Sequence, residues 1–138
     1  METRDILLNS LRGETLGTIT EYSSADEVFQ NQTLRPILKL QNDLFVEVFR
    51  NYIGKHKHDF YQYTVEKKLQ FIENAIQKDI KFRNALKGMV IGLFTIEEYT
   101  RYVQNSSALN KRMMNLLIER LKSQVQLFES TETTYTSI

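Results

Sequence analysis

Apolar residues recur along the chain with the spacing of amphipathic α-helices, whereas the alternation typical of β-strands is not sustained anywhere. The clearest pattern runs from Leu34 to Tyr52, where apolar side chains follow the i, i+3, i+4, i+7 rule, and it predicts a helix that stops at Gly54. Similar stripes run over Leu69–Leu93 and Leu109–Phe128. We expect these three stripes to pack against one another as three long core helices.

Capping signals mark where several helices begin. Ser24 with Glu27, and Thr95 with Glu98, have the spacing of a capping box, in which the hydroxyl accepts the amide three residues on and the carboxylate returns a bond. Thr64 is a further N-cap candidate. These signals predict that three helices begin directly after the capping residues.

Pro36 falls within an otherwise continuous helical pattern. Proline has no amide hydrogen and clashes with the carbonyl four residues earlier, so we expect a break or kink near residues 32–36, with Thr33 as the N-cap of the next helix. Farther along, the apolar pattern over residues 65–94 fits either one long helix or two helices joined near Asp79.

The two ends of the chain are less regular. Residues 3–12 predict a short amphipathic helix that ends at Gly13, and residues 13–24, rich in Gly, Thr and Ser, are either a loop or a short strand. The polar residues 129–138 predict a frayed tail. The fold class is therefore all-α, and residues 1–128 are expected to form one compact, irregular bundle of five to six helices.

The chain has 138 residues and no cysteine. That length suits one globular domain, and the lack of cysteine excludes disulfides, a thiolate nucleophile and a zinc site built on cysteine. The apolar run from Ile6 to Leu8 is too short for a signal peptide, and the cluster from Met89 to Phe94 is far shorter than the ~20 residues of a membrane span. We expect a cytoplasmic protein with no membrane partner.

Charge is unevenly distributed, although the net charge is only +1. Residues 1–30 contain two basic and six acidic side chains, whereas residues 55–87 contain eight basic and four acidic ones. Opposite charges favour contact between the two regions, within one chain or between subunits. A net charge near zero argues against a general nucleic-acid binder, which is usually strongly basic.

Two basic clusters are nevertheless candidates for contact with the phosphates of a nucleic acid, and the alternative is an ordinary solvated helix face. Their members are Lys78, Lys81, Arg83 and Lys87 in the first cluster, and Lys111, Arg112, Arg120 and Lys122 in the second. Arg83 is flanked by apolar residues, so a partly buried guanidinium there would need a carboxylate partner, for which the candidates are Glu47, Glu97 and Glu98.

His56 and His58 are the only histidines, and Asp59 follows them. A His-x-His pair on a strand points both rings the same way and can contribute to a divalent-metal site, but further ligands have to come from elsewhere in the fold. The alternative is a solvated linker over residues 55–63. We expect neither a cofactor nor a bound metal, and the two histidines are the only metal-ligand candidates.

Gly88 and Gly92 lie one turn apart inside an apolar helical stretch. Two glycines at this spacing remove side chains from one helix face, so a neighbouring backbone can approach closely. That neighbour is either a second subunit or a cofactor, or another helix of the same chain. Aromatic residues expected at the surface are further interface candidates, namely Phe60, Tyr61, Tyr99 and Tyr102.

Three stretches carry a resemblance to a known family: QNQTLRPILKLQNDLF (30–45), VEKKLQFIENAIQKDIKFRNALKGMVIGLFT (65–95) and NSSALNKRMMNLLIERL (105–121). They resemble a family of short uncharacterised proteins of Bacteroidota that are often labelled glyoxalase. The label implies a lyase that isomerises a hemithioacetal at a metal bound by His and Glu, on a paired βαβββ fold. This chain departs from that pattern, because it lacks the strands and its two histidines are crowded at 56 and 58. The resemblance carries over no catalytic residue.

These observations predict a small cytoplasmic helical protein that acts as an interaction or assembly module and forms a homo-oligomer. One alternative is a glyoxalase-like, metal-dependent lyase, which the family label implies. The other alternative is a nucleic-acid- or ribosome-associated binder that uses the basic helix faces.

Overall fold

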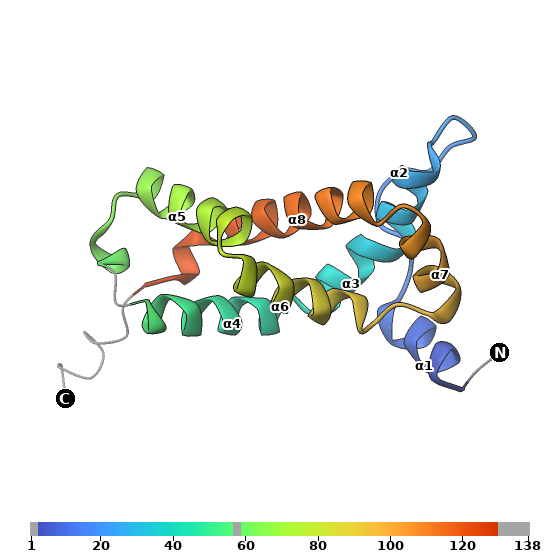
Figure 1. The fold of residues 1–138 in the computed structure, drawn as a ribbon, viewed down its shortest axis with the longest axis horizontal. Coiled ribbons are helices and arrows are strands. Elements are labelled where there is room, and N and C mark those ends of the chain that lie inside the picture. Colours follow the sequence, from blue (N-terminus) through green and yellow to red (C-terminus); the bar gives the residue numbers. More distant parts are fainter. Residues whose placement is uncertain (1–2, 57–58, 130–138) are drawn as a thin grey trace.

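The structure is a computed structural model that describes residues 3–56 and 59–129. Of these residues 79% are helical and none lies in a strand, which confirms the all-α prediction. Figure 1 shows an elongated molecule, with α1 (Thr3–Arg12) and α7 (Ile96–Gln104) at one end and the start of α5 (Val65–Lys78) at the other. The polar tail predicted over 129–138 lies outside the described residues from residue 130 onward.

The remaining elements follow in chain order. Between α1 and α5 lie α2 (Ala25–Phe29), a π-helical turn η1 (Gln30–Leu34), α3 (Arg35–Leu40), α4 (Asn42–Lys55) and a 3-10 turn η2 (Phe60–Gln62). The second half adds α6 (Ile80–Ile91), α8 (Ser106–Ser123) and a final 3-10 turn η3 (Val125–Leu127). Helices α5 and α6 pack against each other and against α8, the longest helix of the described chain.

The described chain has more helices than the five to six expected, because two of the three predicted core helices are divided. Gln41, with φ −89° and ψ 3°, separates α3 from α4. Asp79 leaves the helical region with ψ 96°, and its carboxylate accepts the amide of Phe82, so it ends α5 and caps α6. Residues 65–94 therefore contain two helices.

The predicted helix stop at Gly54 is wrong, since α4 continues to Lys55. Phe45, Phe49 and Ile53 are all buried, so the inward face of α4 reaches the turn that contains Gly54. Packing of that face outweighs the weak helix propensity of one glycine, which costs about 1 kcal/mol relative to alanine.

The break or kink predicted near residues 32–36 takes the form of a π-helical turn over Gln30–Leu34, and the helix is not broken at Pro36. The chain runs from α2 through η1 into α3 with helical dihedral angles, and Pro36 lies in the first turn of α3. The helix widens into a π-helical turn, in which the Arg35 amide donates to the carbonyl of Gln30, five residues earlier. Thr33, predicted as an N-cap, lies inside this turn and is fully buried.

Pro36 instead affects which backbone carbonyls can accept hydrogen bonds from outside the helix. With no amide hydrogen, it donates to neither Asn31 nor Gln32, the residues five and four positions before it. Both carbonyls accept bonds from outside the helix. Asn31 accepts the amide of Leu16 at 2.9 Å, and Gln32 accepts the guanidinium of Arg12 at 3.3 Å.

Residues 13–24 form a loop rather than a strand. Gly13 and Gly17 have φ values of 77° and 98°, which other residues rarely adopt. A Cβ at Gly17 would lie 2.9 Å from the side chain of Asn31, so the loop passes close over η1. The Asn31 amide also donates to the carbonyl of Thr18 at 3.2 Å.

Three of the four predicted N-caps are confirmed. The hydroxyls of Ser24, Thr64 and Thr95 each accept the amide three residues further on. At Thr95 the capping box is complete, because the carboxylate of Glu98 also accepts the Thr95 amide. These helix starts depend on local chemistry, which is why the sequence predicts them.

Phe49 occupies the centre of an aromatic core. Its ring centroid lies 5.0 Å from that of Phe128 and 6.3 Å from that of Phe60. Phe60 was expected at the surface, but the η2 turn places its ring inside the core, with no exposed area. Tyr102, expected to be exposed as well, is only 6% exposed because its ring packs on Phe94, with centroids 5.6 Å apart.

The glycine pair of α6 does not lie at a helix crossing within the described chain. Gly88 is exposed, and a Cβ there would have no heavy atom within 4 Å outside its own helix. Gly92 is the C-cap of α6, and a Cβ there would meet the carbonyl of Gly88 at 3.2 Å. An intrachain crossing is therefore the wrong interpretation, and the glycine face is still a candidate contact surface.

Gly88→Ala is expected to raise the free energy of unfolding by about 0.5–1 kcal/mol, because the space is open and alanine has a lower entropic cost in a helix. Gly17→Ala should lower it, since that position has a positive φ and a close neighbour in Asn31. Urea denaturation followed by circular dichroism measures both. A destabilised Gly88→Ala variant would contradict the open surroundings of Gly88.

Candidate functional site

Helix α1 carries charge on its inward face. Its buried residues are Asp5, Leu8 and Arg12, which share one face at i, i+3 and i+7. Leu7 and Leu11 are 64% and 61% exposed. The helix is amphipathic, as the sequence predicts, but it turns its charged side toward the protein and two leucines toward solvent.

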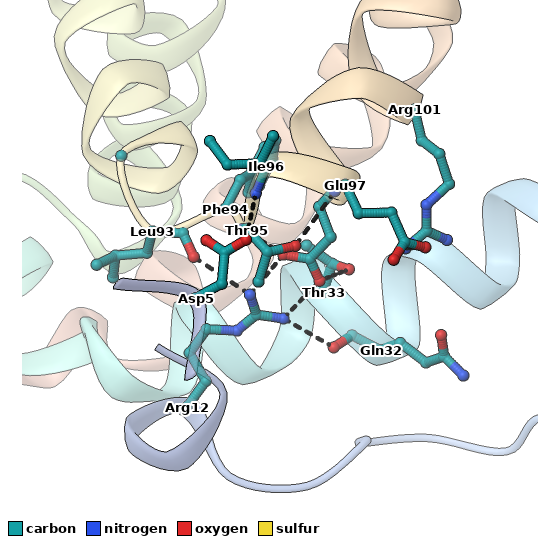
Figure 2. Close-up of polar contacts among 12 residues, drawn as sticks. Asp5, Arg12, Gln32, Thr33, Leu93, Phe94, Thr95, Ile96, Glu97 and Arg101 are labelled. Carbon is teal, nitrogen blue, oxygen red and sulfur yellow. Dashed lines mark hydrogen bonds and ion pairs between the residues drawn. The ribbon is translucent and has the colours of Figure 1, made fainter. Parts of the chain in front are cut away.

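Arg12 and Glu98 form a buried ion pair held by two hydrogen bonds (Figure 2). Nη1 of Arg12 lies 2.5 Å from Oε1 of Glu98, and Nη2 lies 2.7 Å from Oε2. Thr33 donates its hydroxyl to Oε2 at 2.6 Å, and the Thr95 amide donates to Oε1 at 2.8 Å. Four donors therefore saturate the carboxylate, so this arrangement suits a structural role better than general acid–base chemistry.

Arg12 connects α7 to two further segments. Its guanidinium also donates to the carbonyls of Leu93 at 3.2 Å and of Gln32 at 3.3 Å. The Arg12 side chain is 4% exposed and that of Glu98 9%. Because a buried charge is very costly without its partner, this contact holds α1, η1 and the start of α7 together.

The pKa of Glu98 lies below its ordinary value of 4.5. Burial by itself raises this pKa, but hydrogen bonds from Arg12, Thr33 and the Thr95 amide, together with the positive charge of Arg12, outweigh burial. Glu98 is therefore ionised in the folded protein at neutral and mildly acidic pH.

A second set of contacts fixes the first turn of α1 on the connection between α6 and α7. Arg4 donates to the carbonyls of Gly92 at 2.7 Å and of Phe94 at 2.8 Å, just beyond the end of α6. Asp5 accepts the amide of Ile96 at 3.1 Å, in the first turn of α7. A cation thus meets the carbonyl end of one helix and a carboxylate the amide end of the next, as helix dipoles favour.

The carboxylates predicted as partners of Arg83 are paired with other arginines. In the described chain these three carboxylates pair as Glu98 with Arg12, Glu97 with Arg101, and Glu47 with Arg50. The last two lie within single helices at i, i+4 and i, i+3, a spacing that sequence reasoning could have used. The first joins residues 86 positions apart, and spacing alone gave no signal for it.

Helix α7 presents an apolar stripe to solvent. Ile96, Tyr99 and Val103 share a face at i, i+3 and i+7 and are 58%, 49% and 51% exposed. Glu97 and Arg101 form an ion pair at 3.7 Å on the opposite flank of α7, since they lie about 100–140° around the helix from Ile96. Figure 2 shows Ile96 on one side of α7 and the side chains of Glu97 and Arg101 on the other.

The other interface candidates are dispersed. Tyr61 is 38% exposed on η2, far from α7 along the molecule (Figure 1). Gly88 and Gly92 lie on α6 and at its end. Tyr99 is the candidate that shares its helix face with other exposed apolar side chains.

His56 lies at the end of α4 rather than in a linker. Its ring stacks on that of Tyr52, with centroids 3.9 Å apart, and its Nε2 lies 3.6 Å from the carboxylate of Asp79. His58 lies outside the described residues. Within residues 3–56 and 59–129, no three or more His, Asp or Glu side chains are grouped so that they could hold a metal ion.

Tyr52 and Asp79 connect α4 to the start of α6. The phenol donates to the Asp79 carboxylate at 2.9 Å, and burial, then this bond and the carboxylate charge, raise the pKa of Tyr52 to about 12. Hydrogen bonds from the Phe82 amide and from Tyr52 lower the pKa of Asp79. Near neutral pH the phenol is protonated and the carboxylate ionised, so the pair acts as a structural tie.

The basic candidates lie on three helices. Lys78 ends α5, while the others are Lys81, Arg83 and Lys87 on α6 and Lys111, Arg112, Arg120 and Lys122 on α8. Lys78, Lys81 and Lys111 are exposed, and Arg112 donates to the Gln30 side chain at 3.1 Å. Their use by a nucleic acid stays a prediction.

Comparisons with protein-family models, with curated proteins and with solved structures gave no match to this chain. In the part of the chain that the structure describes, every helix is too short or too polar to span a bilayer.

Loss of one member of the buried pair is expected to destabilise the fold strongly. Glu98→Ala leaves Arg12 buried without a counter-charge and should lower the free energy of unfolding by about 3–5 kcal/mol. The exposed-pair control Glu97→Ala should cost less than about 1 kcal/mol. In urea denaturation, Arg12→Met/Glu98→Leu should cost less than the sum of its two single variants, and additive costs would contradict the coupling.

Stability should also fall when acid protonates Glu98. The pKa is lower in the folded than in the unfolded state, so the ionised form contributes its full stability above the ordinary value of 4.5. That contribution is lost as the pH falls through the folded-state pKa. Thermal unfolding from neutral pH down to about pH 3 should show a steeper loss for wild type than for Glu98→Gln. Parallel profiles would rule out Glu98 as the titrating group.

Proposed function

We propose that the protein is an assembly module that forms a homodimer through α7. The observation that carries this proposal is the exposed stripe of Ile96, Tyr99 and Val103, on a helix whose other side is held by the Arg12–Glu98 pair. Apolar side chains that gather on one exposed face are typical of protein–protein contacts. A fixed backbone behind the stripe reduces the ordering cost of association.

The order of residues in the stripe favours a second copy of this chain as the partner. Tyr99 lies between Ile96 and Val103 on the exposed face of α7. When two identical helices meet antiparallel about a twofold axis near Tyr99, Ile96 lies opposite the partner subunit's Val103, so apolar side chains meet on both sides.

Helix α1 extends the apolar surface at the same end of the molecule (Figure 1). Ile6, Leu7 and Leu11 are all more than half exposed. Burial of a leucine or isoleucine side chain contributes about 1.5–3 kcal/mol, so a partner that also covers part of α1 gains affinity. This surface supports an interaction role over the alternatives that use histidines or lysines.

Size-exclusion chromatography with light scattering is expected to show a dimer for the wild type. Ile96→Glu and Val103→Glu should each shift it toward monomer, because each places a charge in the apolar contact. The control Glu97→Gln, on the opposite flank of α7, should leave the dimer intact. A wild type that is monomeric at every concentration, or charged variants that stay fully dimeric, would contradict the proposal.

Gly88→Leu is the control for the competing glycine face, since it enlarges an exposed residue of α6. It should leave the dimer intact. Dissociation by Gly88→Leu but not by Ile96→Glu would assign the interface to α6 instead. Thermal unfolding of each variant separates loss of association from loss of folding.

A further inference from the structure

Two arginines from different helices share one cavity, away from α7. The cavity lies between α3 and α8 and has a volume of about 360 Å³. Arg35 and Leu38 line it from α3, and Leu116 and Arg120 from α8. Its size is at the lower end of the ~300–1,000 Å³ typical of small-molecule sites.

Neither arginine has a carboxylate partner among the described residues. Arg35 donates through Nε to Asn31 at 3.0 Å, and Arg120 reaches the side-chain oxygen of Asn42 only at 3.5 Å. Glu119 lines the same cavity but forms no ion pair with either arginine in the described chain. The arginines that do pair with an acid are Arg4, Arg12, Arg50 and Arg101.

The positive charges of Arg35 and Arg120 repel each other. Burial, and then the positive charge of Arg35, lower the pKa of Arg120. Partly desolvated cations that face one cavity without an ion-pair partner are stabilised when an anion enters. The site therefore has the electrostatics of an anion receptor rather than of a structural salt bridge.

The neighbouring polar side chains are engaged with one another. Gln124 donates to Asn42 at 2.8 Å and to the carbonyl of Arg120 at 2.9 Å, and Ser123 donates to the same carbonyl at 2.7 Å. Recognition of an anion thus falls to the two guanidinium groups. Their planar forks match the oxygens of a phosphoryl group, which can bridge two cations.

We infer that Arg35 and Arg120 bind the phosphoryl group of a small molecule, whose apolar part lies against Leu38 and Leu116. A doubly charged group matches two cations better than a single carboxylate does. The nearby charge of Glu119 disfavours additional phosphates, so the site suits a compact phosphate monoester rather than a polyanion. This inference does not depend on the α7 interface.

Isothermal titration calorimetry at constant ionic strength tests the site, with inorganic phosphate and phenyl phosphate as probes. The wild type should bind both, and phenyl phosphate more tightly because its ring contacts the leucines. Arg35→Gln and Arg120→Gln should each weaken binding about tenfold or more. Arg112→Gln, which removes another half-buried arginine of α8, is the matched control and should bind like the wild type.

Thermal unfolding adds a readout that a purely structural role would not produce. In phosphate-free buffer Arg120→Gln should be at least as stable as the wild type, because the repulsion with Arg35 is relieved. With phosphate present the order should reverse, since only the wild type gains Tm from the ligand. Three results would overturn the proposal. The first is an equal phosphate-induced shift of Tm in wild type and variants, and the second is an Arg120→Gln variant that is less stable but binds phosphate with unchanged affinity. The third is an RNA oligonucleotide whose binding needs both arginines while phenyl phosphate does not bind.

Discussion

The ionic contact between Arg12 and Glu98 organises the end of the molecule where α1, η1 and α7 meet. Its partners are 86 positions apart, and both side chains are almost fully buried. A charge in such surroundings needs its counter-charge and hydrogen-bond partners. Thr33 and the Thr95 amide complete the set for the Glu98 carboxylate, whereas Nε of Arg12 is buried without a partner in the described chain. The position of α7, and with it the exposed stripe, follows from this requirement.

Pro36 contributes to the same arrangement through the hydrogen bond that it cannot make. The chain widens into a π-helical turn before it, and the carbonyls of Asn31 and Gln32 accept donors from the preceding loop and from Arg12. That turn also places the Thr33 hydroxyl against Glu98. Pro36 thus links the π-helical turn to the docking of α1.

Polar docking of α1 has a consequence for the surface. Because Asp5 and Arg12 occupy the inward face, Leu7 and Leu11 are left in solvent at the end of the molecule that also exposes the α7 stripe. In most surface helices the apolar side faces inward. The reversal produces an apolar surface at the same end of the molecule where Phe29, Phe94 and Tyr102 belong to the core.

The sequence by itself determined the all-α class and the helix starts after Ser24, Thr64 and Thr95, because period and capping are local properties of neighbouring residues. Only the tertiary structure decided which face of α1 is buried, which arginine neutralises Glu98, and that Phe60 lies inside the core. These outcomes depend on contacts between residues far apart in the chain. Burial and ion pairing depend on which residues lie close together in space. Spacing along one helix gives no information about the contacts that this helix makes with others.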